Sequence, residues 1–314
     1  MTSPRSSAWL ALGGAVLVGV MTAVQARING QLGLRLDDGL AAAAISFGSG
    51  LMLLIILAAA LPAGRRGVGR LISGIRARTI PWWMLVGGAA GAFTVATQGV
   101  AVAIIGVSLF TVGVVAGQAV CGLVLDRIGY GPSGVVAVTM PRVAGGALAI
   151  AAVVISLQGG VLGQAPWWML LMPLVTGIGI SWQQATNGRL RQRVGSPMTA
   201  TLVNFVGGTT ILVAAAAMHM AVAGRPQPLP AEPWLYVGGV LGLIYIMLSA
   251  ALIAHTGVLL FGLASVTGQL VTAYLLDLFW PAEAAAGWLI GLLTVAIATA
   301  SVVVAAAPWR RRRS

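Results

Sequence analysis

The sequence predicts an all-α polytopic membrane protein with ten transmembrane helices, arranged as two inverted five-helix repeats. Three observations support this fold class. Of the 314 residues, 59% are hydrophobic and only 8% are charged, whereas roughly 25% of the residues in a soluble domain are charged. Apolar runs long enough to span a membrane recur along the chain. Polar and glycine positions of the first half also reappear in order in the second half.

Six apolar runs each have about the 20 residues that a helix needs to cross the hydrocarbon core. They cover residues 8–28, 39–62, 134–157, 166–186, 197–220 and 286–307. Two longer stretches, 81–125 and 234–276, would each be roughly 65 Å long as a single helix. We therefore expect each stretch to be a hairpin of two helices, with turns at 103–106 and 254–257. This gives ten spans.

The basic residues support the same topology, because all eighteen are arginines and they cluster between the apolar runs. With ten spans, fifteen of them fall on the side that holds both chain termini, and the exceptions are Arg27, Arg35 and Arg225. The positive-inside rule assigns the arginine-rich side to the cytoplasm. We therefore attribute the net charge of +12 to the topology of an inner-membrane protein, which contacts lipid. We expect no nucleic-acid partner.

A constant offset relates residues of the two halves. An offset of 158 pairs Gln25 with Gln183, Asn29 with Asn187, Gly30 with Gly188, and Phe47 with Phe205. An offset of 151 pairs Gly106 with Gly257, Gly117 with Gly268, Gln118 with Gln269, and Asp126 with Asp277. We interpret residues 8–157 as the first repeat, 158–165 as a linker, 166–307 as the second repeat and 308–314 as a basic cytoplasmic tail. Because each repeat has five spans, the second is expected to cross the membrane in the opposite orientation.

Four motifs carry a resemblance to a known family. They are Gln-x-x-x-Asn-Gly at 25–30, Ser-Phe-x-x-Gly at 46–50, Pro-Trp-Trp at 81–83, and Gly-Gln followed after seven residues by Asp at 117–126. Together they resemble the YdcZ-like inner-membrane exporters of the drug/metabolite transporter superfamily. The resemblance extends from residue 8 to 307 as two fused copies of a unit that is often encoded singly. It implies small-molecule transport and names no substrate.

Polar side chains at membrane depth are costly unless they are paired or line a cavity, which makes them candidates for a binding site. The predicted substrate-binding residues are Gln25, Ser108, Thr111, Gln118, Gln183, Gln184 and Gln269. Gln118 is expected near the membrane midplane, on the same helical face as Ser108 and Thr111. The alternative interpretation is that these groups only hold helices together through hydrogen bonds.

Two further groups of residues have predicted mechanical roles. Asn29, Gly30, Asn187 and Gly188, with the glutamines beside them, would form gates at opposite membrane faces; alternatively, each Asn-Gly pair simply ends a helix. Gly113 and Gly117 on one helix, and Ala264 and Gly268 on another, form small-xxx-small motifs that predict close approach of these two helices. Asp126 and Asp277 end their helices, where the helix dipole disfavours a carboxylate, so they are expected either to be solvated there or to have a partner elsewhere.

No Asp or Glu lies in the middle of a predicted span, and the sequence contains no metal-binding cluster, phosphate-binding loop or Ser/His/Asp set. We therefore expect neither enzymatic activity nor a cofactor. The predicted function is secondary transport, by alternating access, of small neutral or zwitterionic metabolites or drugs. The alternative is a non-transporting membrane scaffold or accessory subunit. Neither function requires an oligomer.

Overall fold

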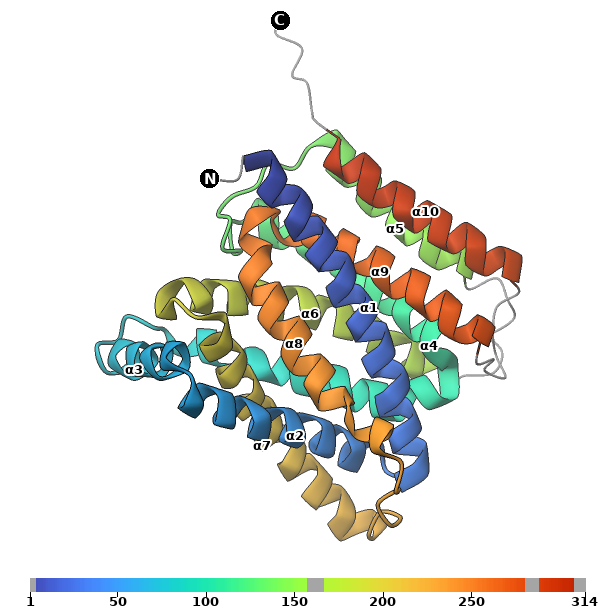
Figure 1. The fold of residues 1–314 in the computed structure, drawn as a ribbon. Helices are drawn as coiled ribbons and strands as arrows, with labels where there is room; N and C mark the ends of the chain where they lie inside the picture. The colour runs from blue at the N-terminus through green and yellow to red at the C-terminus, as the bar shows by residue number, and fades with distance from the viewer. Residues whose placement is uncertain (1–3, 157–166, 280–287, 308–314) are drawn as a thin grey trace, which may run out of the picture.

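The structure, a computed structural model, describes residues 4–156, 167–279 and 288–307. The secondary structure of these residues is helical throughout (Figure 1), and six helical segments are long and apolar enough to cross a membrane. The helices are α1 (Pro4–Leu36), α2 (Gly39–Ala60), α3 (Pro62–Arg76), α4 (Gly87–Arg127), α5 (Met140–Ser156), α6 (Trp167–Val194), α7 (Pro197–Ala223), α8 (Gly238–Leu252), α9 (Val258–Phe279) and α10 (Trp288–Ala306). Three short 3-10 turns are η1 (Trp82–Leu85), η4 (Pro233–Tyr236) and η5 (Ile253–His255). The predicted linker and tail lie outside the described residues.

Aligned helices of the two halves begin in the same way. The carboxylate of Asp38 accepts hydrogen bonds from the backbone N–H groups of Leu40 and Ala41, both at 2.9 Å, and so caps the start of α2. The hydroxyl of Ser196, the residue aligned with Asp38, accepts the N–H of Thr199 at 3.3 Å at the start of α7. Such caps satisfy N–H groups that have no partner within the helix.

The helices α1 and α6 are longer than the sequence indicated. They continue to Leu36 and Val194, so Asn29-Gly30 and Asn187-Gly188 lie inside helices and the prediction that these pairs are helix caps is wrong. Asn29 and Asn187 are fully buried and bond to side chains of other helices. Tertiary contacts therefore override the local preference of Asn-Gly for a helix end.

The two predicted hairpins have different outcomes. The second is confirmed, because α8 is followed by η5, by Gly257 at φ +81° and then by α9. In the first, the backbone of α4 is helical through 103–106, so the predicted break is wrong. However, residues 87–91 meet residues 187–183 of α6 in antiparallel fashion, whereas residues 113–117 meet 173–178 in parallel fashion. The two ends of α4 therefore run in opposite directions relative to α6, as the two arms of a hairpin would.

Glycines of both small-xxx-small motifs lie at close contacts between helices. Gly117 in α4 lies against the carbonyl oxygen of Leu174 in α6, and Gly268 in α9 lies against that of Val16 in α1. The helices α4 and α9 meet elsewhere, near Gly122. A small residue permits the close approach of any helix and does not specify which one. The predicted close approach of α4 and α9 therefore occurs, but Gly117 and Gly268 contact α6 and α1 rather than each other's helix.

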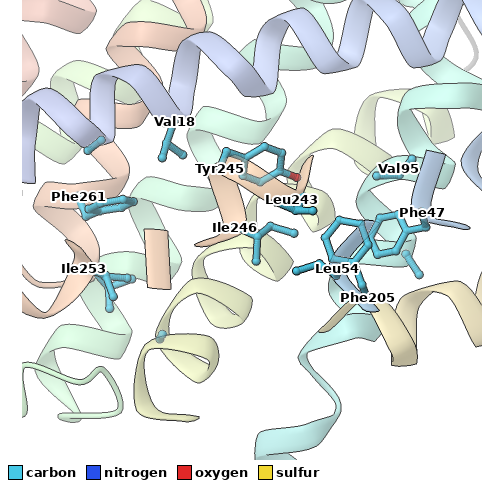
Figure 2. Packing of buried hydrophobic residues seen from close by; sticks show 14 of the residues in the cluster. Val18, Phe47, Leu54, Val95, Phe205, Leu243, Tyr245, Ile246, Ile253 and Phe261 are labelled. Atoms are coloured by element: carbon cyan, nitrogen blue, oxygen red, sulfur yellow. The ribbon is translucent and has the colours of Figure 1, made fainter. Parts of the chain in front are cut away.

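The centre of the hydrophobic core is a stacked pair of aromatic rings from aligned positions. Phe47 in α2 and Phe205 in α7 have ring centroids 4.7 Å apart, and both side chains are fully buried (Figure 2). Gly50 and Gly208 leave the space for these rings, since a Cβ at either position would overlap the phenylalanine of the other helix. The helices α5 and α10 pack side by side at one edge of the bundle, away from this centre (Figure 1).

Candidate functional site

A first amide cluster consists of Gln25, Asn29 and Gln98. The Gln25 Nε2 donates to the backbone oxygen of Gly238 at 2.7 Å, and the Asn29 Nδ2 donates to the Gln98 Oε1 at 2.8 Å. All three side chains are at most 1% exposed. Among the described residues, the Gln25 Oε1, the Asn29 Oδ1 and the Gln98 Nε2 have no hydrogen-bond partner. The cluster therefore presents two acceptors and one donor that are buried and unused.

A second amide cluster consists of Gln183, Asn187 and Asn204. The Asn204 Oδ1 accepts from the Gln183 Nε2 at 2.9 Å and from the Asn187 Nδ2 at 3.3 Å. The Asn204 Nδ2 has no partner within the described part of the chain, and neither has the Oε1 of the neighbouring buried Gln184. Both predicted gate pairs, Gln25 with Asn29 and Gln183 with Asn187, thus lie in buried polar clusters.

Each cluster needs a glycine from the opposite half of the chain. A Cβ at Gly242 in α8 would lie 2.5 Å from the Gln25 Nε2, and a Cβ at Gly91 in α4 would lie 2.5 Å from the Gln183 Nε2. Gly238 and Gly87 similarly make room for the amides of Asn29 and Asn187, respectively. The contacts at aligned positions are thus exchanged between the halves. Amides of the first half contact glycines of the second half, and amides of the second half contact the aligned glycines of the first half.

The stacked rings lie between the two clusters. The position of a Cβ at Gly91 is 3.0 Å from the Phe47 ring, and that at Gly242 is 3.5 Å from the Phe205 ring. The same two glycines touch the glutamines of the clusters. The first amide cluster, the two stacked rings and the second amide cluster therefore form one continuous core between the halves. Figure 2 shows the two rings.

The other predicted binding residues are less closely connected. Gln118 is 1% exposed, and neither atom of its amide group has a partner among the described residues. Its counterpart Gln269 donates to the Ser265 hydroxyl at 3.3 Å within α9. Thr111 is buried, and the side chain of Ser108 lies outside the described residues. Within the part of the chain that is described, no hydrogen bond joins Gln118 or Gln269 to either amide cluster.

Of the two expectations for Asp126, solvation is wrong, because this side chain is only 1% exposed, and a partner elsewhere is what the structure has. Its carboxylate accepts the backbone N–H groups of Val258 and Leu259, at 2.7 and 3.1 Å, and pairs with Arg142 at 2.9 Å. The end of α4 meets the start of α9, where the partial positive charge of a helix N-terminus stabilises an anion. We call these four residues the Asp126 clasp. The side chain of Asp277 lies outside the described residues.

Further contacts hold each end of the bundle. Beside the clasp, the Arg189 guanidinium lies 5.4 Å from the ring centroid of Trp83 and 5.3 Å from that of Tyr130. At the opposite end, the His219 Nδ1 lies 3.1 Å from the Asp38 carboxylate. Both sets join residues of different halves, and the first set lies at the arginine-rich end.

Sequence comparison assigns the chain to a family. The model of the family described as "Putative inner membrane exporter, YdcZ" matches residues 10–155 and again residues 167–304. The chain belongs to the YdcZ family. The two matches confirm the prediction of two fused copies, and this protein is accordingly an inner-membrane protein of a transporter type. No curated protein matches the chain.

Sequence reasoning missed several residues of this YdcZ-family site. Gln98 could have been found, since an amide inside the apolar stretch 81–125 must have a partner or a function. Asn204 could have been found as the amide that replaces Ser46 in the second copy. The pairing of Asp126 with Arg142 and α9 carries no sequence signal, because it depends on how separate helices pack.

Proposed function

We propose that this protein is a secondary transporter that exports small neutral or zwitterionic metabolites or drugs across the cytoplasmic membrane by alternating access. The observation that carries the proposal is the set of buried amides between the halves whose polar atoms have no partner among the described residues. The unpartnered donors are the Gln98 Nε2, the Gln118 Nε2 and the Asn204 Nδ2, and the unpartnered acceptors are the oxygens of Gln25, Asn29, Gln118 and Gln184.

The cost of these unpartnered atoms argues for a ligand. A buried polar group without a hydrogen bond costs about 1–3 kcal/mol, and native proteins retain few of them without a functional reason. A bound molecule that carries both donors and acceptors would satisfy them. Neither amide cluster contains an acidic or basic side chain, so the site offers no charge to balance a strongly ionic substrate. This favours neutral or zwitterionic substrates.

We further propose that the halves are related by a two-fold axis in the membrane plane. The exchanged contacts support this. If a residue of the first half contacts a residue of the second half, a two-fold relation requires the equivalent contact with the roles of the halves reversed. Only equivalent residues near such an axis can meet each other, as Phe47 and Phe205 do at 4.7 Å. Five spans in each half would invert one half relative to the other, an arrangement that suits alternating access.

In this mechanism the halves rock against each other around the amide clusters. The Asp126 clasp and the stacking of Arg189 on Trp83 and Tyr130 would hold the arginine-rich end closed in the present conformation, and that end would face the cytoplasm with both termini. The gate prediction remains part of the proposal: cysteines at Gln25 and Gln183 should change accessibility in opposite directions when substrate is added. Parallel changes would contradict it.

The second candidate is a non-transporting scaffold, and the bonds inside the clusters favour it. Two of these hydrogen bonds, from Asn29 to Gln98 and from Gln183 to Asn204, already join different helices in the way that holds membrane helices together. A scaffold explains these bonds. It leaves the unpartnered amide of Gln118 without a reason.

A ligand screen with two variants separates the candidates. The purified protein is screened by thermal shift against neutral, zwitterionic, cationic and anionic metabolites. Gln118→Ala and Gln98→Leu should lose stabilisation by the best compound, at least tenfold in half-saturating concentration, while they remain folded without it. Gln192→Ala is the matched control, since Gln192 is exposed and bonds only to the Pro132 carbonyl. A stabilising compound that both site variants bind as well as wild type, or a preference for cations, would contradict the proposal.

A further inference from the structure

The helix α3, which the sequence analysis did not predict, has three distinct faces. Gly64 and Gly67 are buried against the end of α2 and the start of α7, where Gly67 lies beside Ser196. Ile72 and Ile75, which are 46% and 43% exposed, form an apolar edge. The remaining face is basic and exposed, with Arg65, Arg66, Arg70 and Arg76. Helices with an apolar edge and a basic face lie in the membrane–water interface.

A cavity of about 360 Å³ lies between α3, the segment that follows it and the end of α6. It is open to the surface and is lined by two arginines and two hydroxyl residues, Arg70, Arg193, Ser73 and Thr79, together with Ile80. None of the residues that line it is acidic. Within the described part of the chain, the guanidinium groups of Arg70 and Arg193 form no hydrogen bond or ion pair. The cavity is therefore a concave basic surface with unused donors.

A glycine just after the end of α6 leaves room for Arg70 beside the cavity. Gly195, just after the end of α6, has φ +65°, a conformation that favours glycine. A Cβ there would lie 2.8 Å from the Arg70 guanidinium. A larger residue there would be disfavoured by this φ, and its Cβ would displace the Arg70 guanidinium.

We propose that this cavity binds an anionic phosphate group. Two guanidinium groups can each form paired hydrogen bonds with phosphate oxygens, a geometry that arginine matches better than lysine does. The interfacial position of α3 places the cavity at the level of lipid headgroups, where anionic lipids attract basic segments. The phosphate can thus belong to the headgroup of an anionic lipid or be free in solution, and the two sources are separated by experiment.

The experiment uses the full-length protein, stripped of lipid in an uncharged detergent. Its melting temperature is measured with dioleoyl phosphatidylglycerol, with dioleoyl phosphatidylcholine, or with inorganic phosphate. The cavity variant combines Arg70→Gln and Arg193→Gln. The control combines Arg66→Gln and Arg76→Gln, which removes the same charge from exposed positions outside the cavity.

Phosphatidylglycerol should stabilise wild type and control alike, and its half-saturating concentration should rise at least tenfold in the cavity variant. Phosphatidylcholine, whose choline balances the phosphate charge, should have a much smaller effect. Stabilisation by inorganic phosphate alone, with no further effect of phosphatidylglycerol, would identify a soluble phosphate as the ligand. Equal weakening in cavity and control variants would overturn the proposal, because it would show that only the total charge matters.

Single substitutions cover the case in which the double cavity variant does not fold. Arg193→Gln alone changes an exposed side chain and should weaken phosphatidylglycerol binding at least threefold. Arg70→Lys keeps the charge and should also weaken binding, because lysine lacks the paired donors. If both single variants bind phosphatidylglycerol as wild type does, the cavity is not the site.

Discussion

Replacing the charge of Asp126 should open the arginine-rich end of the protein. In Asp126→Asn, the carboxamide oxygen can still accept the Val258 N–H, now at 2.7 Å, but its NH2 group then faces the Leu259 N–H and Arg142, both of which are donors. Two charge-assisted hydrogen bonds are lost, each worth about 1.5–3 kcal/mol. The total of about 3–6 kcal/mol spans the cost of about 3–5 kcal/mol for breaking a buried ion pair.

If the clasp forms only when this end is closed, that loss lowers the ratio of closed to open protein about 10²- to 10⁴-fold, since each 1.4 kcal/mol is a factor of ten. The assay is the labelling rate of a single cysteine at Thr186, a fully buried position near the clasp, in a Cys121→Ser background. The rate should rise at least tenfold in Asp126→Asn.

The matched control is Asp38→Asn, which removes another buried carboxylate that caps a helix, at the opposite end of the bundle. It should leave the labelling rate at position 186 unchanged. A folded Asp126→Asn protein that is labelled within twofold of the parent rate would refute the reasoning. So would an equal increase in the Asp38→Asn control, because the effect would then be a general loosening of the bundle.

Three further predictions concern packing and the surface. Gly19→Ala should abolish folding, since its Cβ would overlap a backbone carbonyl of α9. Gly48→Ala should instead gain about 0.5–1 kcal/mol of stability, because no atom lies within 4 Å of its Cβ. Similar folded yields of the two variants would contradict this. A double-mutant cycle of Phe47→Leu and Phe205→Leu, followed by unfolding in SDS, should give a coupling energy of about 0.5–1.5 kcal/mol, and strict additivity would exclude a stabilising stack. Arg35→Ala should change stability by less than about 1 kcal/mol in the same assay, because its ion pair is 56% exposed on the arginine side; a larger loss would mean that this pair is shielded from water.

The parts of the fold that could be predicted depend on local composition, and the parts that could not depend on packing. Apolar length was sufficient to predict a membrane protein, and six helical segments of the described residues are long and apolar enough to cross a membrane, because membrane thickness fixes how many apolar residues a helix needs. The Asn-Gly pairs were misinterpreted as helix ends because the partners that keep them helical, such as Gln98 for Asn29, lie on other helices. The burial of Asp126 was missed for the same reason. Its N–H donors, on Val258 and Leu259, come from the start of a helix more than a hundred residues away.

The exchanged contacts also explain why the two copies of the unit belong together. Gln25 fits only against Gly242 and Gln183 only against Gly91, so each half supplies the amides for one cluster and the glycines for the other. Separated from its partner, either half would expose its buried amides to lipid, at a cost that nothing within that half offsets. Fusion keeps the two halves at a fixed ratio and in one membrane. It also allows them to diverge, as Ser46 and Asn204 have done, so that only the second cluster has an asparagine that accepts from two neighbouring amides. The two sides of the central core therefore differ chemically although their backbone contacts match, and a substrate that lies between them would meet an asymmetric set of donors and acceptors.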